Sequence, residues 1–576
     1  MRSIALTLIF ILAFSNFAAF SKPADTMDQR FESLAKQYIE EFLETKPETA
    51  TQLGDHRYDN RLDDYSRAGQ ERERALSQKY LKALDSFPMN RLSPVNSVDY
   101  RILRNRLEFN LFQIDELREY EWNPLVYNVG NAIYTLIARD FAPLRTRLLN
   151  VRERLKAVPE VVAQAKLNLR NPPRVHTETA IAQNKGTINL VRDELNNFIA
   201  QVPDLKTELA PAQAEAVAAL EDFGHWMETD LMARSTGDFR LGDALYRKKL
   251  RFTLESDLSK EEILKRAMAD LESTQATMYE VALPLFKKYS PQDAAHLDDR
   301  KFVIKSVLSH LAEAHPTNDT IVPLASDDVK QATDFVRAQN MITLPTEPVK
   351  VIVMPEFKRG VAVAYCDPVG PLERSGETFY AISPTPKTWT PTRVESFFRE
   401  YNNYMLEDVT VHEAMPGHYL QLAHSNRFKA PTMVRAVFRS NTFAEGWAVY
   451  AEQLMAERGY GGPEFHMQQL KMRLRTIINA IIDQKIHTAG MTEQEAIDFM
   501  MNEGFQEEGE AAGKWRRAEL TSTQLSNYFV GVTEMNDIRR AYEAKMNGHA
   551  NYHQLHDTML SFGTPAPKYV REMMRL

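Results

Sequence analysis

The sequence predicts a mainly α-helical protein of two lobes with one small antiparallel β-sheet. Three observations lead to this prediction. Apolar residues recur at spacings of three and four along most of the chain, which is the period of an amphipathic helix. The period changes after about Thr343, where short β-branched stretches follow. The 576 residues are 44% hydrophobic and 26% charged, so the chain buries a large core and is long enough to divide into lobes.

The composition excludes several classes of protein. Glycine and proline are scarce, with 22 and 28 residues, and no short repeat or low-complexity tract is visible, which argues against fibrous, disordered and solenoid proteins. The net charge is −8 and the isoelectric point is near 6.0. A mildly acidic chain without a basic stripe gives no reason to expect a nucleic-acid partner. The oligomeric state does not follow from the sequence.

Residues 1–21 have the pattern of a secretory signal peptide. Arg2 precedes an apolar run from Ile4 to Phe14, and small residues lead to an expected cleavage site after Ser21. An uncleaved anchor is the alternative, but the run is shorter than the ~20 residues of a spanning helix. We therefore expect a periplasmic or secreted protein with no stable membrane insertion after cleavage. A single cysteine, Cys366, rules out an intramolecular disulfide, which favours a bacterial periplasm.

Residues 22–340 are predicted to form a helical N-terminal lobe. One apolar stripe, at spacings of three and four, consists of Phe31, Leu34, Tyr38 and Phe42. This stripe predicts a helix that ends before Pro47. No clean linker interrupts residues 26–340, so we treat them as one lobe. Residues 341–576 then form a second lobe, which contains the metal-binding motif.

The β-sheet is expected at the start of the second lobe. Its three strands are predicted at Val349–Val353, Val361–Tyr365 and Thr378–Ile382, around a segment rich in proline and glycine. An edge strand beside a metal site can bind an extended peptide by strand addition. A hairpin that only braces the lobe is the alternative. Helices resume at Thr390-Pro391, with proline at the first helical position.

The residues with chemical potential lie at 411–418, where the sequence is VHEAMPGH, and further along at Glu445. His412 has Glu413 beside it, and His418 follows closely. Two histidines and a downstream glutamate can supply three metal ligands, while the adjacent glutamate can act as a base. This is the outline of a hydrolytic zinc site.

The spacing of the two histidines requires a break in the helix. Residues six apart point roughly 120° away from each other on a regular helix, too far to share one ion. Pro416 cannot continue a regular helix, and Gly417 tolerates unusual backbone angles. We therefore predict a bulged or broken helix between Ala414 and His418 that brings the two imidazoles together. The alternative is that His418 only starts a new helix.

Residues 412–418, together with Glu445-Gly446-Trp447 and the residues up to Glu452, resemble a bacterial family catalogued as domain of unknown function 885. Other segments that look like this family are Pro47–Ala50, Leu53–Tyr58, Tyr528–Gly531 and Leu555–Asp557. The resemblance spans nearly all of the mature chain. The family is similar to the gluzincin metallopeptidases, but has two extra residues between the histidines. It implies a metallopeptidase-like fold with the sheet near the metal site.

The resemblance implies a role for each residue of the motif. His412, His418 and Glu445 would bind one Zn²⁺ ion, and Glu413 would be the general base. The chemistry agrees, because zinc held by two imidazoles and a carboxylate keeps an open position for water. A glutamate beside a ligand can take the proton of that water. The alternative for Glu445 is a solvated position on a helix.

Four other residues have weaker assignments. By resemblance to related peptidases, Tyr528 is a candidate to hydrogen-bond an oxyanion, with core packing as the alternative. Glu452 lies seven residues after Glu445 and would orient a ligand or form a surface salt bridge. His424 could be mistaken for a third histidine ligand, but Glu445 is preferred. Cys366 is expected to be a buried apolar residue rather than a nucleophile.

These observations predict an exported zinc metallopeptidase that hydrolyses small peptides with metal-activated water. One alternative is an inactive protein of the same fold that binds peptides. Another is a non-haem iron enzyme with two histidines and a carboxylate. The glutamate beside His412 favours hydrolysis over both. The sequence does not distinguish cleavage at the amino end, at the carboxyl end or within the peptide.

Overall fold

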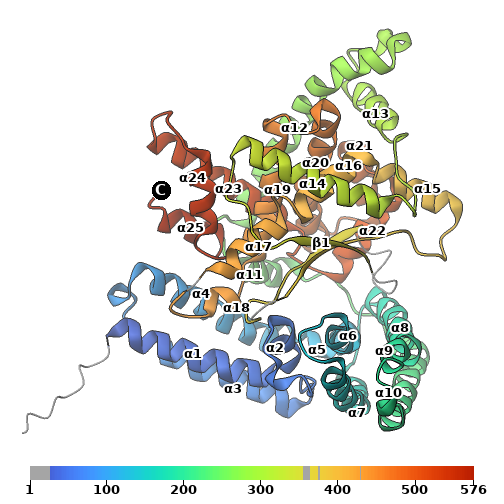
Figure 1. Cartoon of the computed structure of the whole chain (residues 1–576), viewed down its shortest axis with the longest axis vertical. Helices are drawn as coiled ribbons and strands as arrows, with labels where there is room; N and C mark the ends of the chain where they lie inside the picture. The colour runs from blue at the N-terminus through green and yellow to red at the C-terminus, as the bar shows by residue number, and fades with distance from the viewer. Residues whose placement is uncertain (1–25, 355–362, 374–375, 429) are drawn as a thin grey trace, which may run out of the picture.

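A computed structural model describes residues 26–354, 363–373, 376–428 and 430–576. In this part of the chain the fold is mainly α-helical, as predicted (Figure 1). The predicted signal peptide, residues 1–21, lies outside the described residues. Within the described part, no helix has both the length and the apolar character needed to cross a bilayer.

The helices before the sheet are α1 (Met27–Thr45), α2 (Pro47–Leu53), α3 (Arg67–Leu84), α4 (Pro94–Phe112), α5 (Glu119–Trp122), α6 (Gly130–Ala138), α7 (Leu144–Asn168), α8 (Arg174–Asn189), α9 (Leu195–Ile199), α10 (Lys206–Trp226), α11 (Gly242–Leu254), α12 (Lys260–Tyr289), α13 (Arg300–Leu311) and α14 (Ile321–Gln339). Helix α1 ends before Pro47 and buries its apolar stripe, as predicted. In Figure 1, α1 to α10 occupy the lower part of the molecule.

The helices after the sheet are α15 (Pro391–Glu400), α16 (Asn403–Glu413), α17 (His418–Arg427), α18 (Val434–Val437), α19 (Asn441–Glu457), α20 (Gly462–Ala489), α21 (Glu493–Glu503), α22 (Glu508–Leu520), α23 (Ser526–Lys545), α24 (Tyr552–Leu560) and α25 (Pro567–Met573). Helix α15 begins at Pro391 with a Thr390 N-cap, as predicted. Most of these helices lie in the upper part of Figure 1, while α18 contacts α4 below.

The sheet has three strands, but it is mixed rather than antiparallel. The strands are β1 (Val349–Val353), β2 (Ala364–Asp367) and β3 (Thr378–Ile382), in the order β1-β3-β2. Strand β3 pairs parallel with β1 and antiparallel with β2. The predicted antiparallel arrangement is therefore wrong for β1 and β3, because the chain between them is long enough for the crossover that a parallel pair requires. Residues 361–362 of the predicted second strand lie outside the described residues.

The buried cores draw on both sides of residue 340. One cluster joins α11, α12 and α13 to α20, α21 and α22. Another joins α1, α3 and α4 to α18 and to residues at the start of α25. The division into lobes at residue 340 stays a prediction. These shared cores mean that helices distant in sequence hold α18 and α20 in place.

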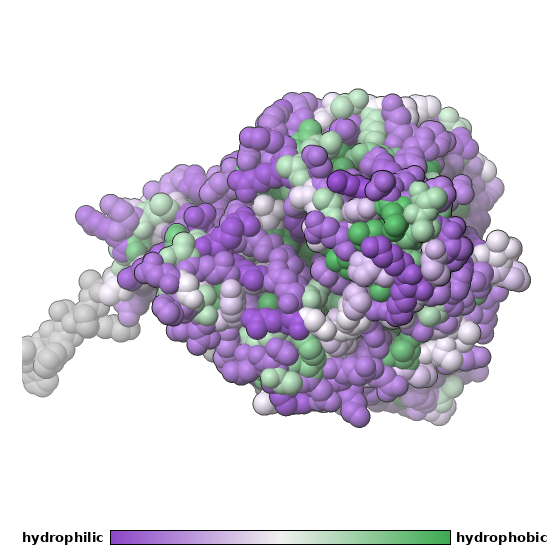
Figure 2. All heavy atoms as spheres, turned by 90° about the horizontal axis from the view of Figure 1, so that it is seen from above, coloured by the Kyte–Doolittle hydropathy of each residue, from purple (hydrophilic) through white to green (hydrophobic). Residues whose placement is uncertain are grey.

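On the face that Figure 2 shows, apolar residues do not form a broad patch. Figure 2 shows this face as mainly hydrophilic, with apolar residues in small scattered groups. The large apolar side chains that are exposed are likewise few among the described residues, and they are Met89, Val95, Leu167, Met268, Val353 and Met433. Scattered apolar residues of this kind are normal on a water-exposed surface.

Helices α19 and α23 approach each other closely at a pair of glycines. A Cβ atom on Gly446 would lie 2.4 Å from the carbonyl carbon of Gly531, and one on Gly531 would lie 2.1 Å from the carbonyl oxygen of Thr442. Both contacts are with backbone atoms, which cannot move aside as a side chain can. The two helices therefore need glycine at both positions to pack at this distance.

We predict that Gly446→Ala or Gly531→Ala lowers the free energy of unfolding by about 1–3 kcal/mol or more, because the extra methyl group forces the backbones apart. Urea unfolding would measure this change. Gly186→Ala is a matched control in α8, where an added Cβ meets no atom within 4 Å. This control should raise the stability by about 0.5–1 kcal/mol. Unchanged stability in both α19 and α23 variants would contradict the prediction.

Candidate metal centre

The helix that contains His412 breaks immediately after Glu413, as the histidine spacing predicts. Helix α16 ends at Glu413, and Ala414 has the non-helical angles φ −118° and ψ −81°. The Met415–Pro416 peptide bond is cis. Helix α17 then begins at His418. The two histidines thus lie at the end of one helix and at the start of the next.

Backbone hydrogen bonds hold this turn against the end of α16. The Gly417 amide donates to the carbonyl oxygen of Val411 at 2.9 Å. A Cβ atom on Gly417 would lie 1.9 Å from the carbonyl oxygen of His412, so only glycine fits here. The indole N–H of Trp447, on α19, donates to the carbonyl oxygen of Pro416 at 2.9 Å. The turn is therefore fixed both to α16 and to the helix that contains Glu445.

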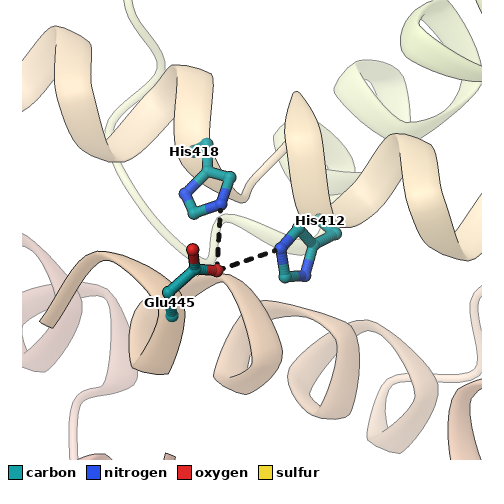
Figure 3. Close-up of side chains that lie close together, drawn as sticks. All are labelled: His412, His418 and Glu445. Atoms are coloured by element: carbon teal, nitrogen blue, oxygen red, sulfur yellow. Dashed lines mark ion pairs between the residues drawn. The ribbon is translucent and has the colours of Figure 1, made fainter. Parts of the chain in front are cut away.

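The side chains of His412, His418 and Glu445 converge on one point (Figure 3). The Nε2 atoms of both histidines lie 3.5 Å from the same carboxylate oxygen, Oε2 of Glu445. Metal–ligand bonds of about 2.1 Å in a tetrahedral site give ligand separations of about 3.4 Å. The three candidate ligand atoms, which lie within 4.8 Å of one another, are thus spaced to bind one small ion.

The same carboxylate oxygen has no hydrogen-bond donor although it is buried. Burial alone would raise the pKa of Glu445, but the His412 and His418 imidazoles hold this pKa well below its usual range. A buried carboxylate without a donor is costly unless a cation compensates it. The residues present therefore fit a divalent metal ion.

Glu452 fixes the orientation of His412. Its carboxylate lies 2.5 Å from Nδ1 of His412, and the side chain is 0% exposed. A surface salt bridge, the alternative for this residue, is therefore wrong. Burial alone would lower the pKa of His412, but Glu445 and Glu452 together raise it well above its usual value. A carboxylate on Nδ1 directs Nε2 toward the metal position, which is common behind histidine ligands.

Glu413 lies between the metal position and strand β2. Its carboxylate accepts a hydrogen bond of 2.9 Å from the backbone amide of Cys366. Strand β2 is an edge strand, because it pairs only with β3 in the described sheet. The glutamate beside the first ligand is thus held next to the free edge of the sheet.

Tyr528 lines the same cavity as His412 and Glu413, a space of about 160 Å³. Its hydroxyl accepts a hydrogen bond of 3.0 Å from Nη2 of Arg517. Burial raises the pKa of Tyr528, and the negative charge of Glu445 adds to this effect. The phenol is therefore protonated at neutral pH. Its hydroxyl also lies near enough to Glu445 for that charge to change its pKa.

The cavity also contains charged residues that the sequence analysis did not find. These are Arg475 on α20 and Glu510, Lys514 and Arg517 on α22. No motif marks them, because they come from two separate helices and become neighbours only through packing.

His424 and Cys366, which the sequence analysis also considered, do not join the three candidate ligands. Nε2 of His424 lies 2.7 Å from the carbonyl oxygen of Thr343, away from the three candidate ligands. Burial raises the pKa of the Cys366 thiol well above its usual value, and the nearby Glu413 raises it further. A thiol that stays protonated is a poor nucleophile, as expected, although Cys366 is half-buried rather than fully buried.

Comparison with known proteins identifies similar chains of unknown function. Residues 47–574 match the profile of a family described as bacterial protein of unknown function (DUF885). A solved structure of a candidate lipoprotein of unknown function from Shewanella oneidensis is 31% identical, with 96% of this chain and 100% of that chain covered and a TM-score of 0.80.

A candidate lipoprotein from Colwellia psychrerythraea is also similar in fold. The identity is 16%, the match covers 96% of this chain and 99% of that chain, and the TM-score is 0.77. No curated protein matches the chain. The comparisons therefore establish the fold and the relatives, while the chemistry has to be argued from the site.

We predict that Gly417→Ala weakens zinc binding by roughly 10–100-fold or more, because the added methyl group opens the turn that positions His418. Competition with a chelator of known affinity would measure the binding. Gly186→Ala, in an open position of α8, should leave zinc binding unchanged. Wild-type affinity in Gly417→Ala would show that the close turn does not position the ligand.

Proposed function

We propose that this chain, which belongs to the DUF885 family of bacterial proteins, is an exported zinc-dependent peptidase that hydrolyses small peptides. The observation that carries the proposal is the common 3.5 Å distance of two histidine Nε2 atoms from one buried carboxylate oxygen, with a second glutamate beside the first ligand. Two imidazoles, a carboxylate and an adjacent base are the components of hydrolytic zinc sites.

His412, His418 and Glu445 would hold the ion, and Glu452, on Nδ1 of His412, would keep Nε2 of that ring directed toward the ion. When bound, zinc lowers the pKa of a water molecule and polarises a peptide carbonyl. Glu413 takes the proton of the attacking water and gives it to the departing amine. The 2.9 Å hydrogen bond from the Cys366 amide holds the Glu413 carboxylate in place for this transfer.

Tyr528 and Arg517 are placed to stabilise negative charge on the substrate carbonyl. The phenol accepts a hydrogen bond from the guanidinium, so its own proton is free to point into the cavity that His412 and Glu413 line. A donor polarised by a neighbouring cation gives a strong hydrogen bond to a developing oxyanion. This supports the role expected for Tyr528 over simple core packing.

Strand β2 is the proposed binding edge for the substrate backbone. It is an edge strand of the described sheet, and its Cys366 amide reaches Glu413. An extended peptide added along this edge would pass the metal position. The small size of the cavity favours peptides over folded proteins as substrates.

Export is supported by the pattern of residues 1–21 and by relatives described as candidate lipoproteins. Cell fractionation would test this location.

We predict that Glu413→Gln lowers peptide hydrolysis by at least roughly 10²–10⁴-fold, because general-base assistance is lost, while zinc stays bound. His418→Ala should lose both zinc and activity, since it removes a ligand. Digestion of a peptide library with mass spectrometry, together with metal analysis, measures both effects. Glu457→Gln, at the 37% exposed carboxylate near the end of α19, is the control.

The same measurements separate the two alternative functions. Retained turnover in Glu413→Gln, or iron rather than zinc in the purified protein, would favour an iron enzyme. Peptide binding without cleavage by the wild-type protein would favour an inactive binding protein. Loss of zinc from Glu413→Gln would show that this glutamate is itself a ligand.

A further inference from the structure

The cavity beside the metal position has a wall rich in positive charge. Arg475 on α20 and Lys514 and Arg517 on α22 line it, together with His412, Glu413 and Tyr528. The cations thus face the same small space as the proposed base and the phenol. Glu452 and Glu510 line the space as well, so a negatively charged group of a ligand is favoured beside Arg517 and Lys514 rather than throughout the cavity.

The carboxylates that line the cavity, which are Glu413, Glu452 and Glu510, equal its cations Arg475, Lys514 and Arg517 in number. Glu400 forms ion pairs with Lys471 and Arg475. Glu510 forms longer ion pairs, at 3.8 Å with Arg475 and at 3.7 Å with Lys514. Arg475 and Lys514 therefore each have a carboxylate partner, which leaves Arg517 to be considered.

Arg517 has no carboxylate partner within the described part of the chain. Its Nη2 atom donates to the side-chain oxygen of Gln524 at 2.8 Å and to the Tyr528 hydroxyl at 3.0 Å. Both partners are neutral. The guanidinium is thus held in position by neutral partners, and Glu445 and Glu510 act on its charge only through space. A guanidinium without a paired carboxylate can form charged hydrogen bonds to a carboxylate of a ligand.

Two further observations point to a missing anion. Nε of Arg475 is buried without an acceptor, and the side chain of Arg475 is only 8% exposed. Burial lowers the pKa of Lys514 to about 8; Glu510 opposes this effect, and repulsion from Arg517 and Arg475 adds to it. An anion in the cavity would relieve this repulsion.

We infer that this cavity binds the free C-terminal carboxylate of the peptide substrate through Arg517, assisted by Lys514, so that the protein releases the last residue of peptides. This inference rests on the proposed peptidase function. In the reaction, the oxygen of water bonds to the carbonyl carbon, the C–N bond breaks, and the departing amine takes a proton. The products are a free amino acid and a peptide with a new carboxylate.

The size and charge of the cavity favour the C-terminus of a peptide over an N-terminus or the middle of a chain. At about 160 Å³ it is smaller than the roughly 300–1,000 Å³ pockets of drug-sized ligands, so it admits an end of a peptide rather than a passing chain. Arg517 and Lys514 would repel an N-terminal ammonium group placed beside them. The hydrogen bond from Arg517 to Tyr528 places the carboxylate subsite beside the proposed reacting carbonyl.

The test compares N-acetylated peptides that end in a free acid with the same peptides ending in an amide. The wild-type protein, loaded with zinc, should cleave the acids with a kcat/KM roughly 10–100-fold higher, because a charged hydrogen-bonded pair is lost in the amide. Mass spectrometry should show release of the C-terminal residue. Glu413→Gln should abolish this cleavage.

Arg517→Gln should lower kcat/KM for both kinds of peptide, because Tyr528 loses its donor, but the ratio of kcat/KM for acids to that for amides should itself fall by roughly the same 10–100-fold. Arg517→Lys, which keeps the charge but loses the fork, should lie between. Arg516→Gln is the matched control on α22, because Arg516 is 47% exposed and pairs with Glu178 at 3.7 Å. It should behave as the wild type. Lys514→Gln should also weaken discrimination, which keeps the test decisive if an Arg517 variant is unstable.

Three results have different meanings. Equal cleavage of acids and amides by the wild-type protein, with Glu413→Gln inactive, would overturn the carboxylate subsite and leave the peptidase function standing. No cleavage of any peptide would instead overturn the proposed function.

Arg439, whose Nη2 donates to Asn426 at 2.6 Å, is a second cation near Cys366 but does not line this cavity. Loss of discrimination in Arg439→Gln but not in Arg517→Gln would overturn the assignment to Arg517.

Discussion

The site depends on one constraint, the contact between Gly417 and the end of α16. His412 and His418 are six residues apart, and a regular helix would point their side chains in different directions. The turn brings the Gly417 backbone so close to the His412 carbonyl that a Cβ atom would lie 1.9 Å from it. Only this compact reversal lets the second imidazole meet Glu445 opposite the first. The extra residues in the motif thus build a turn rather than lengthen a helix.

Sequence analysis identified the residues whose role can be inferred from their neighbours in the chain. The helix break was predictable because Pro416 and Gly417 cannot continue a regular helix between two candidate ligands. The parallel pairing of β1 with β3 was not, since residue pattern marks a strand but not its partner. Arg475, Lys514 and Arg517 were also missed. They share no motif with the histidines, and only the packing of α20 and α22 brings them to the cavity.

Burial decides how the charged residues behave around the metal position. Glu452 is an ordinary helical glutamate in the sequence, but at 0% exposure its charge is compensated mainly by His412. A pair of this kind is costly to bury and sensitive to geometry, so it fixes the ring orientation strictly. The neighbouring Asp408 is fully buried as well, with both carboxylate oxygens lacking a donor. Burial raises the pKa of this carboxyl well above its usual value, which favours a neutral group there.

The glycine contact between α19 and α23 has a mechanical consequence. Glu445 directly precedes Gly446, and Tyr528 lies one turn before Gly531 on the partner helix. Because the two backbones touch at this crossing, the third ligand and the phenol belong to one rigid body. A movement that opens the site while this contact is kept would have to occur elsewhere, for example at the edge strand β2. Such a movement would leave the distance between Glu445 and Tyr528 unchanged.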